Sequence, residues 1–212
     1  CISHLDLQRF MQMALRSTDL PVAYSQGFNP HPILSFASAL AMGVTSSAEL
    51  MDVKMEKDVT EDFALSQMNR ALPPDLPLIA VRAIDDQHPA LMALLRMADY
   101  RIDLPESAAP IAEAVDDFLA EEHVIAIRKT KSGEKPTDIR PLSVVLSSKE
   151  TEIGYEIRAR LMLTERDTLK PSLLLETLST RAGVALPQGI AIHRIALLGE
   201  DASGNPKDLF AL

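Results

Sequence analysis

Two histidines and a carboxylate are the residues of this chain best suited to proton transfer or metal binding. His4 and Asp6 stand two residues apart near the start of the chain, and His31 follows in a polar segment. Imidazole and carboxylate groups serve as general acids and bases and as ligands of divalent metals. If that segment lies beside the start of the first helix, the three side chains would line one pocket. Simpler roles are also open, because Asp6 suits a first helical turn and an imidazole can bond a backbone carbonyl.

The segment 24–32, with the sequence YSQGFNPHP, predicts a binding loop. It contains two prolines, a glycine and two aromatic residues, and it has no formal charge. Gly27 can adopt a positive φ, while Pro30 and Pro32 fix their own φ and favour extended geometry in the residues before them. We expect a stiff loop, and polar groups held on such loops commonly serve in binding. The candidate ligand-binding residues are His4, Asp6, Tyr24, Gln26, Phe28, Asn29 and His31.

A basic stretch in the second half of the chain is a candidate contact for phosphate or RNA. Five cations and two acids lie between residues 123 and 141, whereas the whole chain has a formal net charge of −9. A basic hairpin tip can hold phosphates. A charged tip is also an ordinary solvated turn, and lysines often protect strand edges. The candidate contacts are Arg128, Lys129, Lys131, Lys135 and Arg140.

The composition excludes several classes of protein. Of the 212 residues, 47% are hydrophobic and 24% are charged, which is typical of a globular protein, and the negative charge argues against a protein that coats duplexes. The single cysteine, Cys1, excludes an internal disulfide or an all-cysteine metal site within this chain. No apolar run approaches the ~20 residues that span a bilayer. We expect a cytoplasmic protein without a membrane partner.

Common catalytic and nucleotide-binding motifs are absent from the sequence. It has no glycine-rich dinucleotide or P-loop pattern, no HExxH and no GxSxG. An enzyme of these motif-bearing classes is therefore not expected, and the sequence assigns no cofactor and no metal.

Hydrophobic periodicity and capping residues predict the elements that must position these side chains. In the first half we expect helices over 3–16 and 60–72 and strands over 22–24, 33–37, 48–55 and 76–84. In the second half we expect helices over 108–122 and 171–179 and strands over 100–104, 124–129, 139–146, 155–163 and 190–198.

Each half then has the order strand, helix, strands, helix, strand, provided that a strand precedes Cys1. This order predicts an α+β fold of two ferredoxin-like α/β sandwich halves with antiparallel sheets, the first strand of the first half being missing from this chain. The halves span 1–88 and 98–200, a short helix within 90–97 links them, and 201–212 is a loose polar tail.

Several of these segments resemble the radical SAM-linked protein family. The resemblance lies in SHLD at 3–6, LPVAYSQGFNPHP at 20–32, the pairs at 35–36 and 43–44, Glu49, KTKSGEK at 129–135 and DIRP at 138–141. Ala41 and Met42 depart from the family's pattern before Gly43. That family is an uncharacterised bacterial domain that is fused to a radical SAM protein or encoded beside one. The resemblance implies a radical SAM partner and no established activity. This chain lacks the CxxxCxxC cysteines that bind the iron–sulfur cluster, so it cannot supply that chemistry itself.

These observations favour a non-catalytic binding module associated with a radical SAM enzyme, recognising RNA or another phosphate-bearing substrate. In this hypothesis Tyr24, Phe28 and Phe36 offer stacking faces and the basic stretch contacts phosphates. The alternative is a small enzyme or metal-dependent site built on His4, Asp6 and His31. A protein–protein adaptor that uses an exposed sheet edge is a third possibility.

Overall fold

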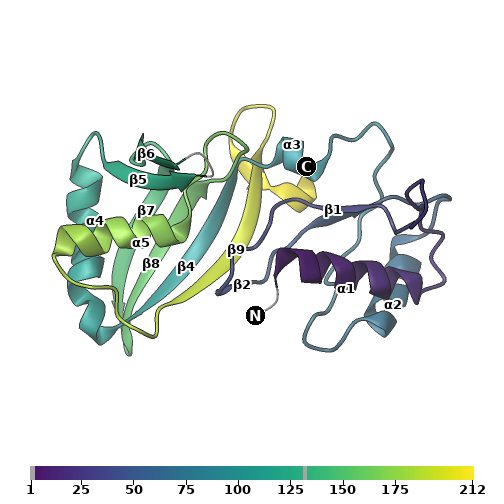
Figure 1. Cartoon of the computed structure of the whole chain (residues 1–212), viewed down its shortest axis with the longest axis horizontal. Coiled ribbons are helices and arrows are strands. Elements are labelled where there is room, and N and C mark those ends of the chain that lie inside the picture. The colour runs from purple at the N-terminus through teal and green to yellow at the C-terminus, as the bar shows by residue number, and fades with distance from the viewer. Residues whose placement is uncertain (1–2, 131–132) are drawn as a thin grey trace. The chain divides into compact units, whose positions relative to one another are not determined.

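The computed structural model describes residues 3–130 and 133–212 and divides the chain into two compact units (Figure 1). Unit 1 comprises Cys1–Met42 and Glu49–Leu94, and unit 2 comprises Gly43–Ala48 and Leu95–Leu212. Both contain helices and strands, so the α+β prediction is confirmed. The finer prediction of two ferredoxin-like halves is not confirmed. Within the described part of the chain, no helix is both long and apolar enough to cross a membrane.

Unit 1 packs two amphipathic helices around a small sheet. Its elements are α1 (His4–Arg16), β1 (Leu34–Phe36), β3 (Met51–Val53), α2 (Glu61–Ala71) and α3 (Leu91–Leu94), with β1 antiparallel to β3. The helices predicted over 3–16 and 60–72 are confirmed, and each begins at a side-chain cap: the Ser3 hydroxyl accepts from the Asp6 N–H, and the Thr60 hydroxyl accepts from the Phe63 N–H. The core consists of buried side chains from both helices and from the chain around β1: Met11, Ala14, Leu15, Leu20, Val22, Phe36, Ala64, Met68 and Leu72.

Unit 2 is built on a larger sheet whose strand order is β10-β9-β4-β8-β7, with β2 also pairing parallel to β9. The strands are β2 (Val44–Ser46), β4 (Met97–Pro105), β7 (Ser143–Thr151), β8 (Gly154–Met162), β9 (Ala191–Glu200) and β10 (Pro206–Asp208). A short 3-10 turn, η1 (Glu106–Ala108), leads into helix α4 (Ala109–Ala120). Helix α5 (Pro171–Ala182) packs against α4. Side chains such as Ile102, Phe118, Ile157 and Leu174 are fully buried in this core.

Between α4 and β7 in the chain, the strands β5 (Ile125–Thr130) and β6 (Gly133–Asp138) form a separate two-stranded hairpin. Its register places Arg128 opposite Lys135 and Lys129 opposite Glu134. The strand predicted over 139–146 is wrong in its first part, because the chain turns after Ile139 and β7 begins only at Ser143.

Three further predictions are corrected by the structure. No strand forms over 76–84, where Asn69 holds the chain through side-chain bonds to the Leu78 N–H and carbonyl and where Ile79 is exposed. The segment 22–24 makes only isolated bridges. The tail is not loose: the Asp201 carboxylate accepts from two backbone N–H groups in a turn that returns the chain along β9. It ends in a 3-10 turn, η2 (Leu209–Ala211), with Leu209 buried.

Candidate binding surfaces

The predicted binding loop is closed by its own hydrogen bonds. The Ser25 N–H donates to the His31 carbonyl at 2.9 Å, and the His31 N–H donates to the Ser25 hydroxyl at 3.2 Å. Tyr24 forms a bridge with Pro32 at the base, and Gly27 has φ 127°, a conformation that side chains rarely adopt. The segment 24–32 is therefore held in one shape.

The imidazole of His31 helps to hold this shape. The Nδ1 atom of His31 lies 3.0 Å from the Ser25 hydroxyl and 3.3 Å from the Asn29 carbonyl. The Phe28 ring is fully exposed, and Tyr24 is partly so. Within the described chain, the side chains of Gln26 and Asn29 make no hydrogen bond. A guest would therefore meet the Phe28 ring and two amides rather than Nδ1 of the imidazole.

The structure does not bring His4 and His31 together. His4 packs edge-on against Phe36 with ring centroids 5.4 Å apart at the start of α1. Arg16, the last residue of α1, donates to the Pro30 carbonyl at 2.9 Å, which ties the loop to the other end of that helix. A 13-residue helix is about 20 Å long, so the two histidines lie far apart.

Asp6 has a local structural role at the start of α1. The Ser3 hydroxyl donates to its carboxylate at 2.6 Å, and Arg9 lies 3.8 Å away. The Ser3 bond is the main reason that the pKa of Asp6 lies below its usual value. No group of three or more His, Cys, Asp or Glu residues that could hold a metal ion occurs among the described residues. The predicted grouping of His4 and Asp6 with His31 is therefore not formed, because the loop lies at the other end of α1.

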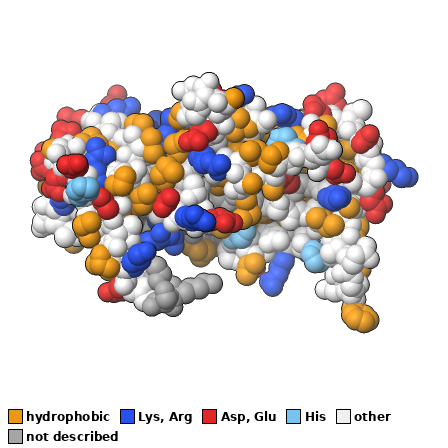
Figure 2. Space-filling model, turned by 90° about the horizontal axis from the view of Figure 1, so that it is seen from above, with side chains coloured by type: hydrophobic (Ala, Val, Ile, Leu, Met, Phe, Trp, Pro, Cys, Tyr) orange, Lys and Arg blue, Asp and Glu red, His pale blue; other side chains and the backbone are white. Residues whose placement is uncertain are grey.

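The candidate cations have different surroundings. Arg140 donates to the carbonyls of Leu119 and Glu121 at the end of α4, and its guanidinium lies 5.9 Å from the centre of the Phe118 ring. It therefore completes a helix end. Arg128 is half-buried, Lys129 and Lys135 are exposed, and Lys131 lies outside the described residues. On the face shown in Figure 2, blue and red side chains are interspersed rather than gathered into one basic area.

A hydrogen bond between His123 and Asp138, which was not predicted from the sequence, anchors the base of the hairpin. The Nδ1 atom of His123 lies 2.7 Å from the Asp138 carboxylate, whose other oxygen accepts from the N–H groups of Val124 and Arg140. The His123 bond, followed by the Val124 bond, lowers the pKa of Asp138. These residues lie fifteen positions apart, and only the strand pairing shows that they meet.

A contact of His193 with two hydroxyl groups was also not predictable from the sequence, because it depends on the parallel pairing of two distant segments. β2 lies beside β9, so the His193 ring meets Thr45 through Nδ1 at 2.8 Å and Ser47 through Nε2 at 3.1 Å. Thr45 and Ser47 are both exposed residues. In the sequence, His193 is isolated, and no local signal connects it to residues 43–48.

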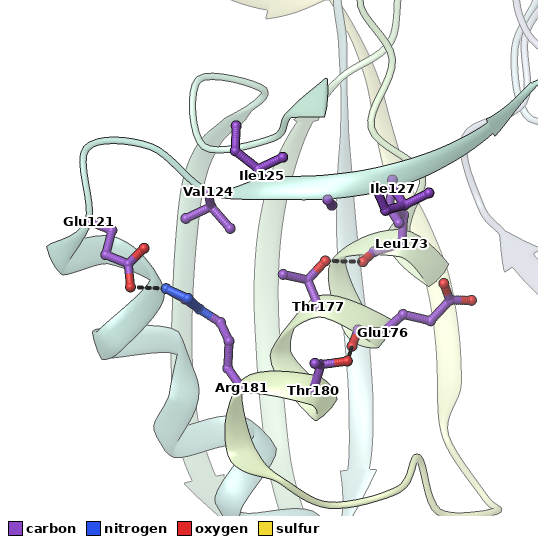
Figure 3. A pocket seen from close by; sticks show the side chains of 10 residues that line it. Glu121, Val124, Ile125, Ile127, Leu173, Glu176, Thr177, Thr180 and Arg181 are labelled. Atoms are coloured by element: carbon purple, nitrogen blue, oxygen red, sulfur yellow. Dashed lines mark hydrogen bonds and ion pairs between the residues drawn. The ribbon is translucent and has the colours of Figure 1, made fainter. Parts of the chain in front are cut away.

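A groove of about 530 Å³ lies between β5 and α5 (Figure 3). Apolar side chains from β5 and Leu173 line it, and Thr177 and Thr180 lie on the α5 side. The Glu121 carboxylate pairs with Arg181 at one end. The groove was not predictable from the sequence, because residues 124–129 indicate only a strand and give no sign that α5 lies beside it.

The sequence matches a family model that describes uncharacterized proteins conserved in bacteria, termed DUF2344, over residues 1–171. The chain belongs to this family. The DUF2344 match includes the closed loop and the hairpin, and it ends at the first residue of α5. It does not connect the chain to radical SAM proteins, so the likeness is confirmed only at the level of a conserved bacterial family. No curated protein matches the chain with significance.

Proposed function

We propose that this DUF2344 chain is a non-catalytic binding module that recognises single-stranded RNA and places Phe28 against a base. The observation that carries the proposal is the fully exposed Phe28 ring on a loop closed by Ser25 and His31. Covering a large apolar side chain is worth about 1.5–3 kcal/mol, so an exposed ring on a rigid support gains by meeting a partner. Because the loop's shape is already held, binding loses little conformational entropy.

The remaining contacts of the loop would come from side-chain amides. Among the residues described, the side chains of Gln26 and Asn29 make no hydrogen bond, so their donors and acceptors can meet base edges. The loop 24–32 has no charge. In unit 2, taken by itself, Arg128, Lys129 and Lys135 of the β5–β6 hairpin are a second and separate candidate contact for phosphates. The net charge of −9, with acidic side chains interspersed among the basic ones on the face shown in Figure 2, limits the attraction of nucleic acid at long range and favours short single strands over duplexes.

Fluorescence anisotropy with a labelled 12-nucleotide oligouridine tests the proposal. Base–aromatic stacking is worth ~1–3 kcal/mol, so Phe28→Ala should weaken binding about five- to 150-fold. Phe28→Leu keeps an apolar side chain without an aromatic face and should lose most of the same affinity. Ile153→Ala, which removes another highly exposed apolar side chain, is the matched control and should bind as the parent does.

The salt dependence tests the role of the hairpin. Each phosphate contact to a single strand contributes ~0.7 to the slope of log K against log salt, so replacing Lys129 and Lys135 together by alanine should reduce the slope by about 1.4. Equal affinity of Phe28→Ala and the parent protein for the oligouridine, at every salt concentration, would disprove recognition through the loop.

The family resemblance supports a further part of the proposal, association with a radical SAM enzyme in the cytoplasm. Anaerobic co-purification with a radical SAM protein fused to or encoded beside this chain tests it, and failure to associate would remove this part alone.

We also infer that unit 2 is ferredoxin-like. This is supported by the order β9-β4-β8-β7, with α4 following β4 and α5 joining β8 to β9.

A further inference from the structure

Among the residues that the structure describes, one edge of β5 in the β5–β6 hairpin has no partner strand. Ile127 lies opposite Pro136, which has no N–H, so this pair is one of the non-hydrogen-bonded pairs of the ladder. The Ile139 N–H donates to the Val124 carbonyl at 2.8 Å, which fixes the same alternation from the other end. It follows that the backbone N–H and C=O groups of Ile125 and Ile127 point away from β6.

These outward groups are unpaired in the described part of the chain, where β5 pairs with β6 alone. The other edge of the hairpin differs, because Pro136 removes the N–H that would face outward from β6. Proline on an edge strand is a common protection against unwanted pairing. One edge of the hairpin is thus blocked, and the edge along β5 keeps its donors and acceptors.

The unpaired edge borders the groove in Figure 3. Val124 and the first three residues of β5 line it, and their side chains alternate between the two faces of the strand, which places the groove along the strand edge: Val124, Ile125, Ala126 and Ile127. Val124 and Ala126 are buried, whereas Ile125 and Ile127 are 63% and 50% exposed. Across the groove, Leu173 and Thr177 lie one helical turn apart on α5.

The charges and hydroxyls of the α5 side indicate what could enter. The carboxylate of Glu121 is already paired with Arg181, but Glu176 has no ion pair or hydrogen bond through its carboxylate among the residues described. The hydroxyls of Thr177 and Thr180 donate to carbonyls of their own helix at 2.8 Å. The α5 side therefore offers apolar contact and one uncompensated negative charge.

We propose that this groove binds an extended segment of a partner polypeptide, which pairs with β5 as a third strand. Backbone groups at alternate positions of β5 would bond the segment, alternate apolar side chains would contact Leu173 and the buried β5 residues, and a Lys or Arg of the segment would pair with Glu176. Strand addition beside a helix is an established way to recognise peptides, with affinity from main-chain bonds and specificity from alternate side chains. This interaction is independent of RNA recognition by the loop.

Residue-resolved hydrogen exchange of the full chain tests the free edge directly. In the free protein the amides of Ile125 and Ile127 should exchange quickly, and those of Ala126 and Arg128 slowly, since the latter bond β6. Slow exchange at Ile125 and Ile127 in the free protein would overturn the proposal, because the edge would then already be covered.

Binding is tested with a panel of labelled hexapeptides that alternate valine with threonine and carry one arginine at each position in turn. A bound member should protect the Ile125 and Ile127 amides from exchange. N-methylation of the peptide amides that face β5 should weaken binding about tenfold for each amide lost, whereas methylation of the intervening amides should not. If no member of the panel binds at millimolar concentration, or both methylation patterns bind equally, the proposal is wrong.

Variants of the protein separate backbone from side-chain contributions. Ile127→Pro removes an outward N–H without removing a ladder bond and should abolish protection of the edge, while Ile127→Thr should retain it. Glu176→Gln should remove the preference for arginine in the panel but leave the protection pattern unchanged. Phe28→Ala should bind the hexapeptides normally, so failure of the groove and failure of RNA recognition remain distinguishable.

Discussion

Gly154 begins β8 at a position where an added carbon atom has no room. Its φ is +144°, and a Cβ built on it would lie 2.1 Å from the Leu104 carbonyl oxygen and 2.9 Å from the Pro105 carbonyl carbon. Both neighbours are backbone atoms of β4, which pairs with β8 at this point. The clash cannot be relieved by rotating a side chain, so Gly154→Ala must separate the ends of these two strands.

The cost has two parts. A non-glycine residue at such a φ costs roughly 1–3 kcal/mol, and forcing extra volume into a packed region costs roughly 1–3 kcal/mol more. We therefore expect a loss of about 2–6 kcal/mol in the free energy of unfolding of unit 2, from the 5–15 kcal/mol typical of a domain. At roughly 4 °C for each kcal/mol, the melting temperature should fall by about 8–24 °C.

Calorimetry and urea unfolding followed by circular dichroism measure this loss, since the chain has no tryptophan to report by fluorescence. Gly183→Ala is the matched control: Gly183 ends α5 with φ +68° and has open space around the position of a Cβ. It should cost only the backbone preference, about 1–2 kcal/mol. The steric argument fails if Gly154→Ala is no more destabilising than Gly183→Ala.

Three further predictions concern polar contacts. Asp138→Asn should lower the free energy of unfolding at neutral pH, and its difference from the parent should shrink as the pH falls below about 4. The folded-state pKa of Asp138 is lowered, so the ionised carboxylate stabilises the fold at any pH above its unfolded-state pKa, and this contribution is lost as the carboxyl becomes protonated in the folded protein. Urea titrations at several pH values measure the difference, and a difference that does not change with pH would contradict this role of Asp138. Ser3→Ala should cost about 1 kcal/mol through loss of the α1 cap, and Ser3→Asp should restore most of it in the same unfolding assay. Arg140→Ala should lower the free energy of unfolding of unit 2 by about 1–3 kcal/mol and leave the affinity for oligouridine unchanged, because the Arg140 guanidinium donates to carbonyls at the end of α4. A loss of affinity without a loss of stability would instead show that Arg140 contacts the RNA.

Local features of the site were predictable because short-range chemistry determines them. Gly27, Pro30 and Pro32 restrict the backbone of the loop wherever it lies, and the structure holds 24–32 closed as expected. The helices capped by Ser3 and Thr60 were predictable for the same reason.

Contacts between distant residues were not predictable in this way. The proximity of His4 and His31, which seemed plausible from their types, fails because Arg16 holds the loop at the far end of α1. The cations of the basic stretch could not be distinguished in the sequence. In the structure, Arg140 donates to a carbonyl at the end of α4, whereas Lys129 is exposed.

The amino-acid sequence by itself determined the class of chain, most of its helices and the stiffness of one loop, since these depend on composition, periodicity and the backbone limits of glycine and proline. Tertiary structure alone decided that 43–48 joins unit 2 through β9 and that the polar tail pairs as β10. It also decided that, within the described ranges 3–130 and 133–212, the edge of β5 beside α5 has no partner strand. The physical reason is that strand partners and register come from hydrogen bonds between segments far apart along the chain, and no local preference specifies which edge remains unpaired.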